Sequence, residues 1–331
     1  MAPMNGKARP FLNILKQKPL LAVFEVNLRC NSSCGYCDLP LNQGRYEMSR
    51  REINRVFTSL YAEGVRFVFM QGGEPTLRKD LLQIMRDLHD IGFIQTLVTN
   101  GTRIMHSFVQ TLQTMPVSIS ISLDTLNRER YRRIRGADQL NIVLAGINRL
   151  RDYPHPKYIT CIVSEENRSD VREVVNFARD HGFTPVLTPY HWNVGRYGRV
   201  DPGLQYDKEA VASLFGEILH SGLIPKGFLS GYVRDNINWL KGKSLGRCDA
   251  GRYSVSIDAS GNVAACLAME HAGNLLQTDL PGILKKMDME KVRQCSDNSG
   301  CNVICNRLVD ANLRHPIRAL RSPDLVRTFS R

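Results

Sequence analysis

The stretch Leu21-Ala-Val-Phe-Glu-Val-Asn-Leu-Arg-Cys30-Asn-Ser-Ser-Cys34-Gly-Tyr-Cys37 joins an apolar run to three closely spaced cysteines. The apolar run, residues 21–26, predicts a buried strand. The cysteines follow it with a C-x3-C-x2-C spacing, so one tight loop offers three thiolates. A cubane iron–sulfur cluster is usually held by four thiolates. We therefore predict a cluster that has one iron open to another ligand.

Two other interpretations of this triplet are weaker on the residues. A zinc site needs four ligands to close its tetrahedron, and no His or fourth Cys lies near the triplet in the sequence. A disulfide would leave one of the three thiols over, and nothing in the sequence suggests export.

The composition is that of a globular chain, with 331 residues, 43% hydrophobic and 23% charged. This length allows one large α/β domain plus a small appendage. The first twenty residues lack a long apolar core, and no later stretch reaches about 18 apolar residues, so we expect neither a secretion signal nor a membrane span. Nine cysteines in such a chain suit a reducing compartment, so we expect a cytoplasmic protein.

The formal net charge is +12, which would attract a phosphorylated or carboxylated partner. Part of this charge is local, because residues 311–331 carry five Arg and one Asp, and we interpret them as a basic solvated tail. The sequence has no basic motif with interleaved aromatic residues, so it does not predict sequence-specific nucleic-acid binding.

From residue 20 to residue 189, short apolar runs alternate with longer amphipathic ones, which predicts repeated β-α units. The expected strands are 21–26, 67–70, 96–99, 118–122, 159–163 and 185–188. The expected helices are 49–64, 77–89, 107–114, 140–151 and 169–181. The first has a capping box, Ser49 with Glu52. Six such units imply a parallel sheet with right-handed crossovers, open or curled into part of a barrel, and ligands bind at its strands' carboxyl ends.

Four further stretches fall at the ends of successive expected strands or beside the cysteines. Gly72-Gly73-Glu74-Pro75 follows the second strand, Asn100-Gly101 the third, and Ser122 and Asp124 the fourth. Tyr36 stands directly before the last cysteine of the triplet. Taken singly, each of these has an ordinary explanation as a turn or a helix cap. In this order after the cysteine triplet, they resemble the motifs of the radical S-adenosylmethionine (SAM) enzymes. The resemblance covers residues 20–200.

The resemblance implies a partial (β/α)6 TIM barrel in which Cys30, Cys34 and Cys37 hold a [4Fe–4S] cluster. The open iron would chelate the methionine part of SAM, and an electron donor such as flavodoxin or ferredoxin would reduce the cluster. The implied cofactor-binding residues are Tyr36, Gly72, Gly73, Glu74, Asn100, Ser122 and Asp124. Within this picture the two glycines let the backbone approach the amino group of SAM, and Tyr36 lies near its adenine.

The remaining cysteines resemble part of the SPASM/twitch extension, which binds auxiliary clusters. Cys248 and Cys266 flank an expected hairpin (residues 253–257 and 262–266) and match its first half. Cys295-x5-Cys301-x3-Cys305 matches the end of its second half, but Val292 stands where a further cysteine would be. We therefore expect one auxiliary [4Fe–4S] cluster, held by Cys248, Cys266, Cys305 and either Cys295 or Cys301. A zinc site built from the same residues is the alternative.

The expected organisation is an N-terminal arm (1–19), a partial barrel (20–200), a helical bridge (201–246), a small hairpin-containing α+β iron–sulfur domain (247–310) and the basic tail (311–331). We expect residues 190–192 (Tyr-His-Trp) either to pack or to line the barrel mouth. Cys161 on the fifth strand is interpreted as a buried small residue. Residues 11–18 are interpreted as an ordinary arm, with a short amphipathic helix as the alternative.

By this resemblance the chain is a radical SAM enzyme that abstracts a substrate hydrogen, in an oxidation, epimerisation or rearrangement. The absence of an obvious peptide-recognition domain at the N-terminus favours a small polar metabolite such as a sugar, cyclitol or nucleotide. A peptide-modifying enzyme is the alternative within the family. A non-catalytic electron carrier or redox sensor is the alternative outside it, which explains the cysteines but not the ordered SAM motifs.

Overall fold

The computed structural model describes residues 9–42, 44–192, 200–298, 300–307 and 312. The basic tail predicted at 311–331 lies outside these residues, apart from Asn312. The strands are β1 (Leu21–Glu25), β2 (Phe67–Gln71), β3 (Ile94–Thr99), β4 (Val117–Ser122), β5 (Lys157–Val163), β6 (Thr184–Pro189), β7 (Ser254–Ile257), β8 (Asn262–Ala264) and β9 (His271–Asn274). The α-helices are α1 (Arg9–Leu15), α2 (Arg50–Ala62), α3 (Leu81–Ile91), α4 (His106–Gln113), α5 (Arg128–Arg135), α6 (Leu140–Arg149), α7 (Val171–Asp180), α8 (Lys208–His220), α9 (Phe228–Leu240), α10 (Leu280–Lys286) and α11 (Met289–Asp297).

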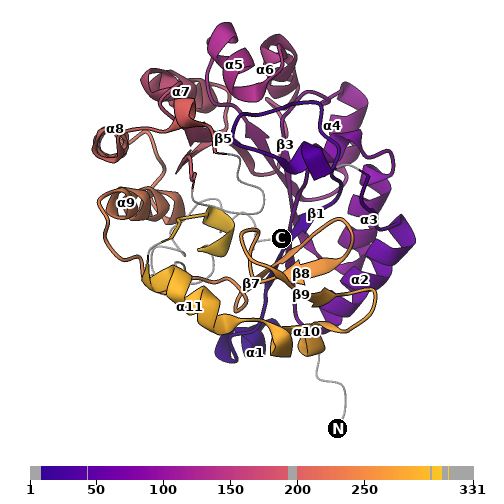
Figure 1. The fold of residues 1–331 in the computed structure, drawn as a ribbon. Helices are drawn as coiled ribbons and strands as arrows, with labels where there is room; N and C mark the ends of the chain where they lie inside the picture. The colour runs from indigo at the N-terminus through magenta and orange to yellow at the C-terminus, as the bar shows by residue number, and fades with distance from the viewer. Residues whose placement is uncertain (1–8, 43, 193–199, 299, 308–311, 313–331) are drawn as a thin grey trace.

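The strands form one sheet in the order β6-β5-β4-β3-β2-β1-β7-β8-β9. All neighbours from β6 to β7 run parallel, while β7–β8 and β8–β9 are antiparallel. Helices α2 to α9 form an arc outside the strands (Figure 1). The predicted partial (β/α)6 barrel is confirmed, and the predicted hairpin extends its sheet. That β7 would pair with β1 could not be foreseen.

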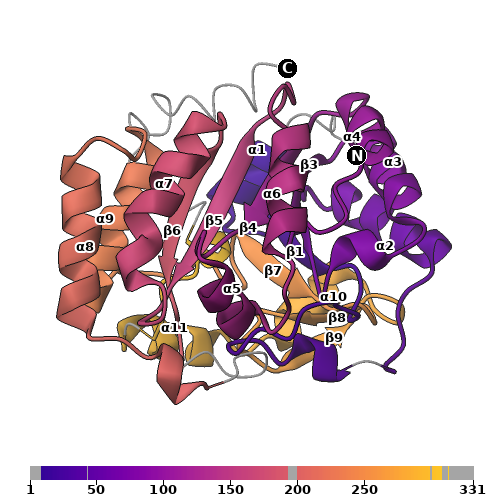
Figure 2. The same ribbon diagram turned by 90° about the horizontal axis from the view of Figure 1, so that it is seen from above.

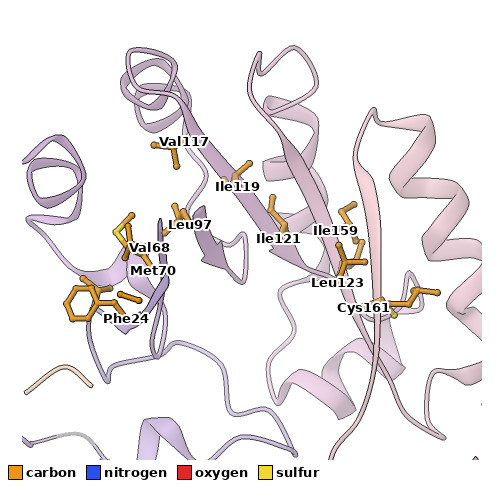
Figure 3. Packing of buried hydrophobic residues seen from close by; sticks show 14 of the residues in the cluster. Phe24, Val68, Met70, Leu97, Val117, Ile119, Ile121, Leu123, Ile159 and Cys161 are labelled. Carbon is orange, nitrogen blue, oxygen red and sulfur yellow. The ribbon is translucent and has the colours of Figure 1, made fainter. Parts of the chain in front are cut away.

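The outer face of the curved sheet packs on the helices. Figure 3 shows part of this core, in which alternate residues of β4 (Val117, Ile119, Ile121) point the same way. Because neighbouring side chains in a strand point to opposite faces, Ser118, Ser120 and Ser122 face the other side. This inner face, which we call the lumen, is where a ligand could be enclosed.

Helix α2 begins as the capping box predicts. Ser49 Oγ accepts a hydrogen bond from the Glu52 amide (3.3 Å), and Glu52 Oε2 accepts one from the Ser49 amide (2.8 Å). The arm also forms a short helix, α1, whose Asn13 side chain donates to the carbonyls of Pro19 and Glu63, both at 2.9 Å. Asn13 thereby ties the arm to the end of α2.

Figure 2 shows α7, α8 and α9 at the β6 end of the sheet and α2, α3 and α4 at the other. Helices α8 and α9 correspond to the predicted bridge and lie near the edge of β6 that no strand pairs with in the sheet order. No helix within the described ranges combines the length and apolar character that crossing a membrane would require.

Candidate functional site

A cavity of about 170 Å³ opens at the carboxyl ends of β2 to β5. It is lined by the three cysteines of residues 29–38, which we call the cysteine loop. The other predicted site residues in its wall are Tyr36, Gly72, Gly73, Glu74, Asn100 and Ser122. The structure therefore brings together most of the residues predicted from separate parts of the sequence. Asp124 is the exception.

The cysteine loop is hydrogen-bonded to the C-terminus of α5. The Ser33 and Gly35 amides donate to the carbonyls of Arg135 and Ile134, both at 3.0 Å. Gly136 ends α5 with φ +67°, and a Cβ there would lie 2.4 Å from the Ser33 carbonyl oxygen. Only glycine combines this left-handed backbone with so close an approach.

A second support comes from the end of β3. The Asn100 side-chain amide donates to Asn31 Oδ1 (2.8 Å) and Ser32 Oγ (3.3 Å). Gln139, at the start of α6, donates to the Asn31 carbonyl (3.1 Å). The predicted cofactor residue Asn100 thus orients the loop between Cys30 and Cys34.

Glu74 is a buried connector between the β2 and β3 loops. Its carboxylate accepts hydrogen bonds from Thr99 Oγ1 (2.6 Å), the Asn100 amide (2.7 Å) and the Thr76 amide (3.0 Å). Burial raises the pKa of Glu74, and these hydrogen bonds oppose the rise. Because the Glu74 carboxylate accepts hydrogen bonds from protein groups, Glu74 forms a rigid part of the cavity wall.

Close packing of the backbone requires glycine at positions 72 and 73. A Cβ on Gly72 would lie 2.3 Å from the Asn27 carbonyl oxygen, and one on Gly73 would lie 2.2 Å from that of Arg29. Both loops therefore touch backbone to backbone, since no side chain fits between them. This contact fixes the Gly72-Gly73 backbone, which lines the cavity, against residues 27–29, and an exposed backbone there fits a cofactor held against it.

Asp124 lies below the cavity, fully buried, and forms an ion pair with Arg135 (2.7 Å). It also accepts hydrogen bonds from the Tyr36 hydroxyl (3.2 Å) and the Ile162 amide (2.9 Å). Burial raises the pKa of Asp124 and Arg135 opposes the rise. A direct role for Asp124 in contacting SAM stays a prediction; in this structure its partners are protein groups.

Arg135 is a charged cavity residue that was not predicted from the sequence. It lies 4.0 Å from Cys34 Sγ and has its guanidinium 5.6 Å from the Tyr36 ring centre. In the sequence it sits in Arg128–Arg135, where Arg-rich spacing indicates a solvated helix face. The following glycine, a helix C-cap, was the available signal that this arginine ends a helix at a loop.

The cysteine-loop thiols are close enough to affect one another. Burial raises the pKa of Cys37 to about 12, and negative charge on Cys34 and Cys30 adds to the rise. Burial also raises the pKa of Cys30, with a further contribution from Cys34. Three thiols grouped in one cavity form a donor set that suits an iron–sulfur cluster, because bound iron would offset the charge of the thiolates.

The five C-terminal cysteines, which we call the auxiliary cysteines, also influence one another. Burial raises the pKa of Cys248 to about 11 and of Cys266 to about 12, and charge on Cys301 adds to both shifts. Burial raises the pKa of Cys305 as well, with contributions from Cys266, Cys248 and Cys301. Charge on Cys295 also raises the pKa of Cys266 and of Cys301, so these interactions link all five thiols and do not choose the fourth ligand.

Cys295, on the last turn of α11, differs from the other four in burial. Its side chain is exposed, whereas Cys301 is partly buried and Cys266 and Cys305 are buried, which favours Cys301 as the fourth ligand. Among the described residues, no three His, Cys, Asp or Glu side chains are placed to hold a single metal ion.

The packing of the side chains tests two further predictions, those for residues 190–192 and for Cys161. The Tyr190 ring lies 6.1 Å from the Tyr36 ring, so residue 190 reaches the cysteine loop. His191 instead packs on Trp239 of α9 at 4.5 Å, and burial lowers the pKa of His191 to about 4. Cys161 is buried on the helix side of β5, where Figure 3 places it with the outer core. It therefore faces away from the lumen.

Family models match both cysteine sites. The model of the radical SAM superfamily matches residues 24–178, which include the cysteine loop and the three strand-end motifs. Residues 24–178 thus form a radical SAM domain. A second model, an iron–sulfur cluster-binding (SPASM) domain, matches residues 248–307, which hold all five auxiliary cysteines. These two domains imply a [4Fe–4S] cluster, SAM and an auxiliary cluster.

Relatives of this radical SAM chain include "Probable GTP 3',8-cyclase" from Pyrococcus horikoshii, 34% identical over 45% of the chain and 49% of that protein. The protein of the same name from Sulfurisphaera tokodaii is 30% identical over 46% of the chain and 50% of that protein. The chain thus spans about half the length of these curated relatives.

Solved structures of the same fold include Streptococcus suis SuiB bound to the precursor peptide SuiA, with TM-score 0.68 and 17% identity over 83% of this chain and 67% of SuiB. Native anSMEcpe with bound AdoMet has TM-score 0.64 and 18% identity over 83% of this chain and 83% of that one. At these identities the likeness establishes the fold.

Proposed function

We propose that this chain cleaves SAM reductively to a 5'-deoxyadenosyl radical, which removes a hydrogen atom from a small polar substrate. The net reaction would be an oxidation, epimerisation or rearrangement. The observation that carries the proposal is the single cavity that collects three thiols, the Gly72-Gly73 backbone and the ends of β3 and β4.

When bound and reduced, the cluster supplies the electron that breaks a carbon–sulfur bond of SAM. The chain's own groups then have separable tasks. Cys30, Cys34 and Cys37 hold the iron, and the backbone at Gly72 and Gly73 leaves room for the methionine end of SAM. Asn100, Glu74 and the end of α5 keep the loop rigid through the hydrogen bonds described above. Preorganisation of this kind lowers the cost of orienting the reacting groups.

The lumen supports a substrate rich in hydrogen-bonding groups. Ser120 Oγ and Thr160 Oγ1 lie 2.8 Å apart on its wall, with Ser122 above them at the cavity. Glu25 also occupies an inner-face position of β1, since Phe24 beside it lies in the outer core. The relatives named GTP 3',8-cyclase favour a nucleotide-like or sugar-like molecule. A peptide is the alternative substrate.

The location and electron donor follow as parts of the same proposal. Nine cysteines, grouped mostly at two iron sites, suit a reducing compartment, so we place the protein in the cytoplasm. A flavodoxin or ferredoxin would then supply the electron.

The decisive experiment incubates the anaerobically reconstituted, reduced protein with SAM and measures 5'-deoxyadenosine. We expect its formation, and a change of the cluster's EPR spectrum on SAM addition. The variant with Cys30, Cys34 and Cys37 all changed to Ala is the control and should form none. If the wild-type chain formed none with any reductant and SAM left its spectrum unchanged, the electron-carrier interpretation would replace this one. Adding nucleotides, sugars and peptides in turn tests the substrate class by stimulated SAM cleavage.

A further inference from the structure

The free edge of β6 is joined to the auxiliary cysteines by three buried side chains, Tyr232, Asn236 and Asn302, which we call the docking network. Tyr232 and Asn236 belong to α9, and Asn302 lies between Cys301 and Cys305. Their exposed fractions are 2%, 0% and 0%. Groups this deeply buried need partners, because an unpaired polar group in the interior is costly.

Asn236 connects the two sides directly. Its side-chain amide donates to the Leu187 carbonyl of β6 (3.2 Å), while its Oδ1 accepts from the Asn302 side chain (2.7 Å). In the described sheet β6 pairs only with β5, so a side chain here satisfies a backbone group that a further strand would otherwise take.

Tyr232 makes the second connection. Its hydroxyl lies 2.7 Å from the Asn302 carbonyl oxygen, to which it donates, and 3.1 Å from Thr188 Oγ1. Thr188 pairs in register with Ile162, a residue of the cavity wall. The phenol thus spans the space between the barrel wall and the peptide that follows Cys301.

The auxiliary segment also packs inside the barrel. Cys305 contacts an apolar group on the inner face of β1 that includes Leu21 and Val23, and Val303 packs beside it. Residues 301–305 are therefore held from two directions, by apolar contact on β1 and by hydrogen bonds on α9 and β6.

We propose that Tyr232 is a positioning residue that docks the auxiliary cysteine segment onto the open edge of the barrel and sets the electrostatic environment of the auxiliary cluster. The inference rests on the proposed ligand set that includes Cys301 and Cys305. Without the phenol hydroxyl, the Asn302 carbonyl keeps its partial negative charge beside the cluster without a donor. Hydrogen bonding near the ligands is one of the main influences on a cluster's reduction potential.

The test uses Tyr232→Phe in the background that lacks Cys30, Cys34 and Cys37, so that the auxiliary cluster alone is observed. We expect an EPR-monitored redox titration to give a more negative midpoint potential than in the parent. Amide exchange of residues 301–305 should be on the order of fivefold faster, as for loss of one net hydrogen bond. Tyr153→Phe is the matched control, because its buried hydroxyl also donates to one carbonyl, that of Val117 (2.7 Å), but on another part of the barrel.

A midpoint potential that is the same in the Tyr232→Phe and Tyr153→Phe proteins would overturn the proposal. If Tyr232→Phe does not fold, Thr188→Val removes the hydroxyl on the barrel side alone and should shift the potential in the same direction by less. If the background variant binds no iron, the auxiliary ligand set is wrong. The exchange rate of residues 301–305 in that protein then decides the docking separately.

Discussion

The cysteine loop and the auxiliary cysteines are built in different ways. The loop supplies Cys30, Cys34 and Cys37 from ten consecutive positions, 29–38, and hydrogen bonds from α5, β3 and α6 hold it in place. The auxiliary thiols come from separate segments, before β7, after β8, at the end of α11 and after it. The first site therefore depends on local geometry, and the second exists only when distant segments of the chain meet.

This difference predicts which substitutions should disrupt each site. Closing a short loop costs little chain entropy, whereas bringing distant segments together costs more and must be repaid by packing. We expect the cysteine loop to be sensitive to single backbone contacts. The auxiliary site should be sensitive to the identity of its ligands and to the docking of residues 301–305.

The largest expected effect separates two auxiliary cysteines. Cys301→Ala should remove the auxiliary cluster, about four iron atoms per chain, because Cys301 is the more buried of the two candidates for the fourth ligand. Cys295→Ala should leave the iron content unchanged, since this thiol is exposed. Iron and sulfide analysis of the reconstituted variants provides the measurement. Iron loss in Cys295→Ala with retention in Cys301→Ala would reverse the assignment.

The next effect concerns the backbone beneath the cysteine loop. Gly136→Ala forces a Cβ against the Ser33 carbonyl and strains a left-handed residue, so it should cost about 4 kcal/mol or more and displace the loop. Gly242→Ala is the matched control. Its φ is similarly positive at +72°, but nothing lies within 4 Å of the new Cβ, so it should cost about 1 kcal/mol.

Chemical denaturation gives both free energies of unfolding, and SAM-dependent changes in the EPR spectrum report the state of the loop. Equal destabilisation by the two alanines would show that the contact with Ser33 relaxes easily. The loop would then be less dependent on α5 than its hydrogen bonds suggest.

The smallest effect tests the boundary between the two regions, where His191 packs on Trp239 near the backbone of Asn302. Burial lowers the pKa of His191 from 6.5 to about 4. Between these values the unfolded chain binds a proton that the folded chain does not, so stability falls as the pH drops. Unfolding should cost about 1 kcal/mol less at pH 5.5 than at pH 7.5 from this group alone.

His191→Gln should remove this part of the pH dependence, while the exposed His106→Gln should leave it unchanged. Chemical denaturation of the reconstituted protein at both pH values gives the free energies of unfolding to compare. If His191→Gln had the wild-type pH dependence, the imidazole would have to be accessible to protons in the folded state.

Much of the barrel could be predicted because its signals are local. The apolar runs predicted the six barrel strands β1 to β6, and the capping box placed the start of α2 at Arg50. The helix α5 was missed because its buried contacts are few, mainly Tyr131 and Ile134 among five arginines. The pairing of β7 with β1 was missed because register between distant strands leaves no local pattern.

The same distinction between local signals and contacts of distant segments applies to the candidate site. Residues whose role follows from spacing, such as the cysteine triplet, lie where they were expected around the cavity. Roles that depend on neighbours in space were not visible in the sequence. Asp124 follows its strand as the family's motif does, yet its partner Arg135 comes from the next helix and only the fold brings the two charges together. The docking network likewise joins residues from α9 and the auxiliary segment.

The parallel pairing of β1 with β7 has a consequence for how the protein is made. Leu21 pairs with Ser254 and Phe24 with Ile257, so one edge of the strand that leads into the cysteine loop stays unpaired until the ribosome has released residues 254–257. An unpaired apolar edge invites association with other nascent chains. We expect iron to be inserted after translation, once β7 has closed that edge, and chaperones to protect it until then.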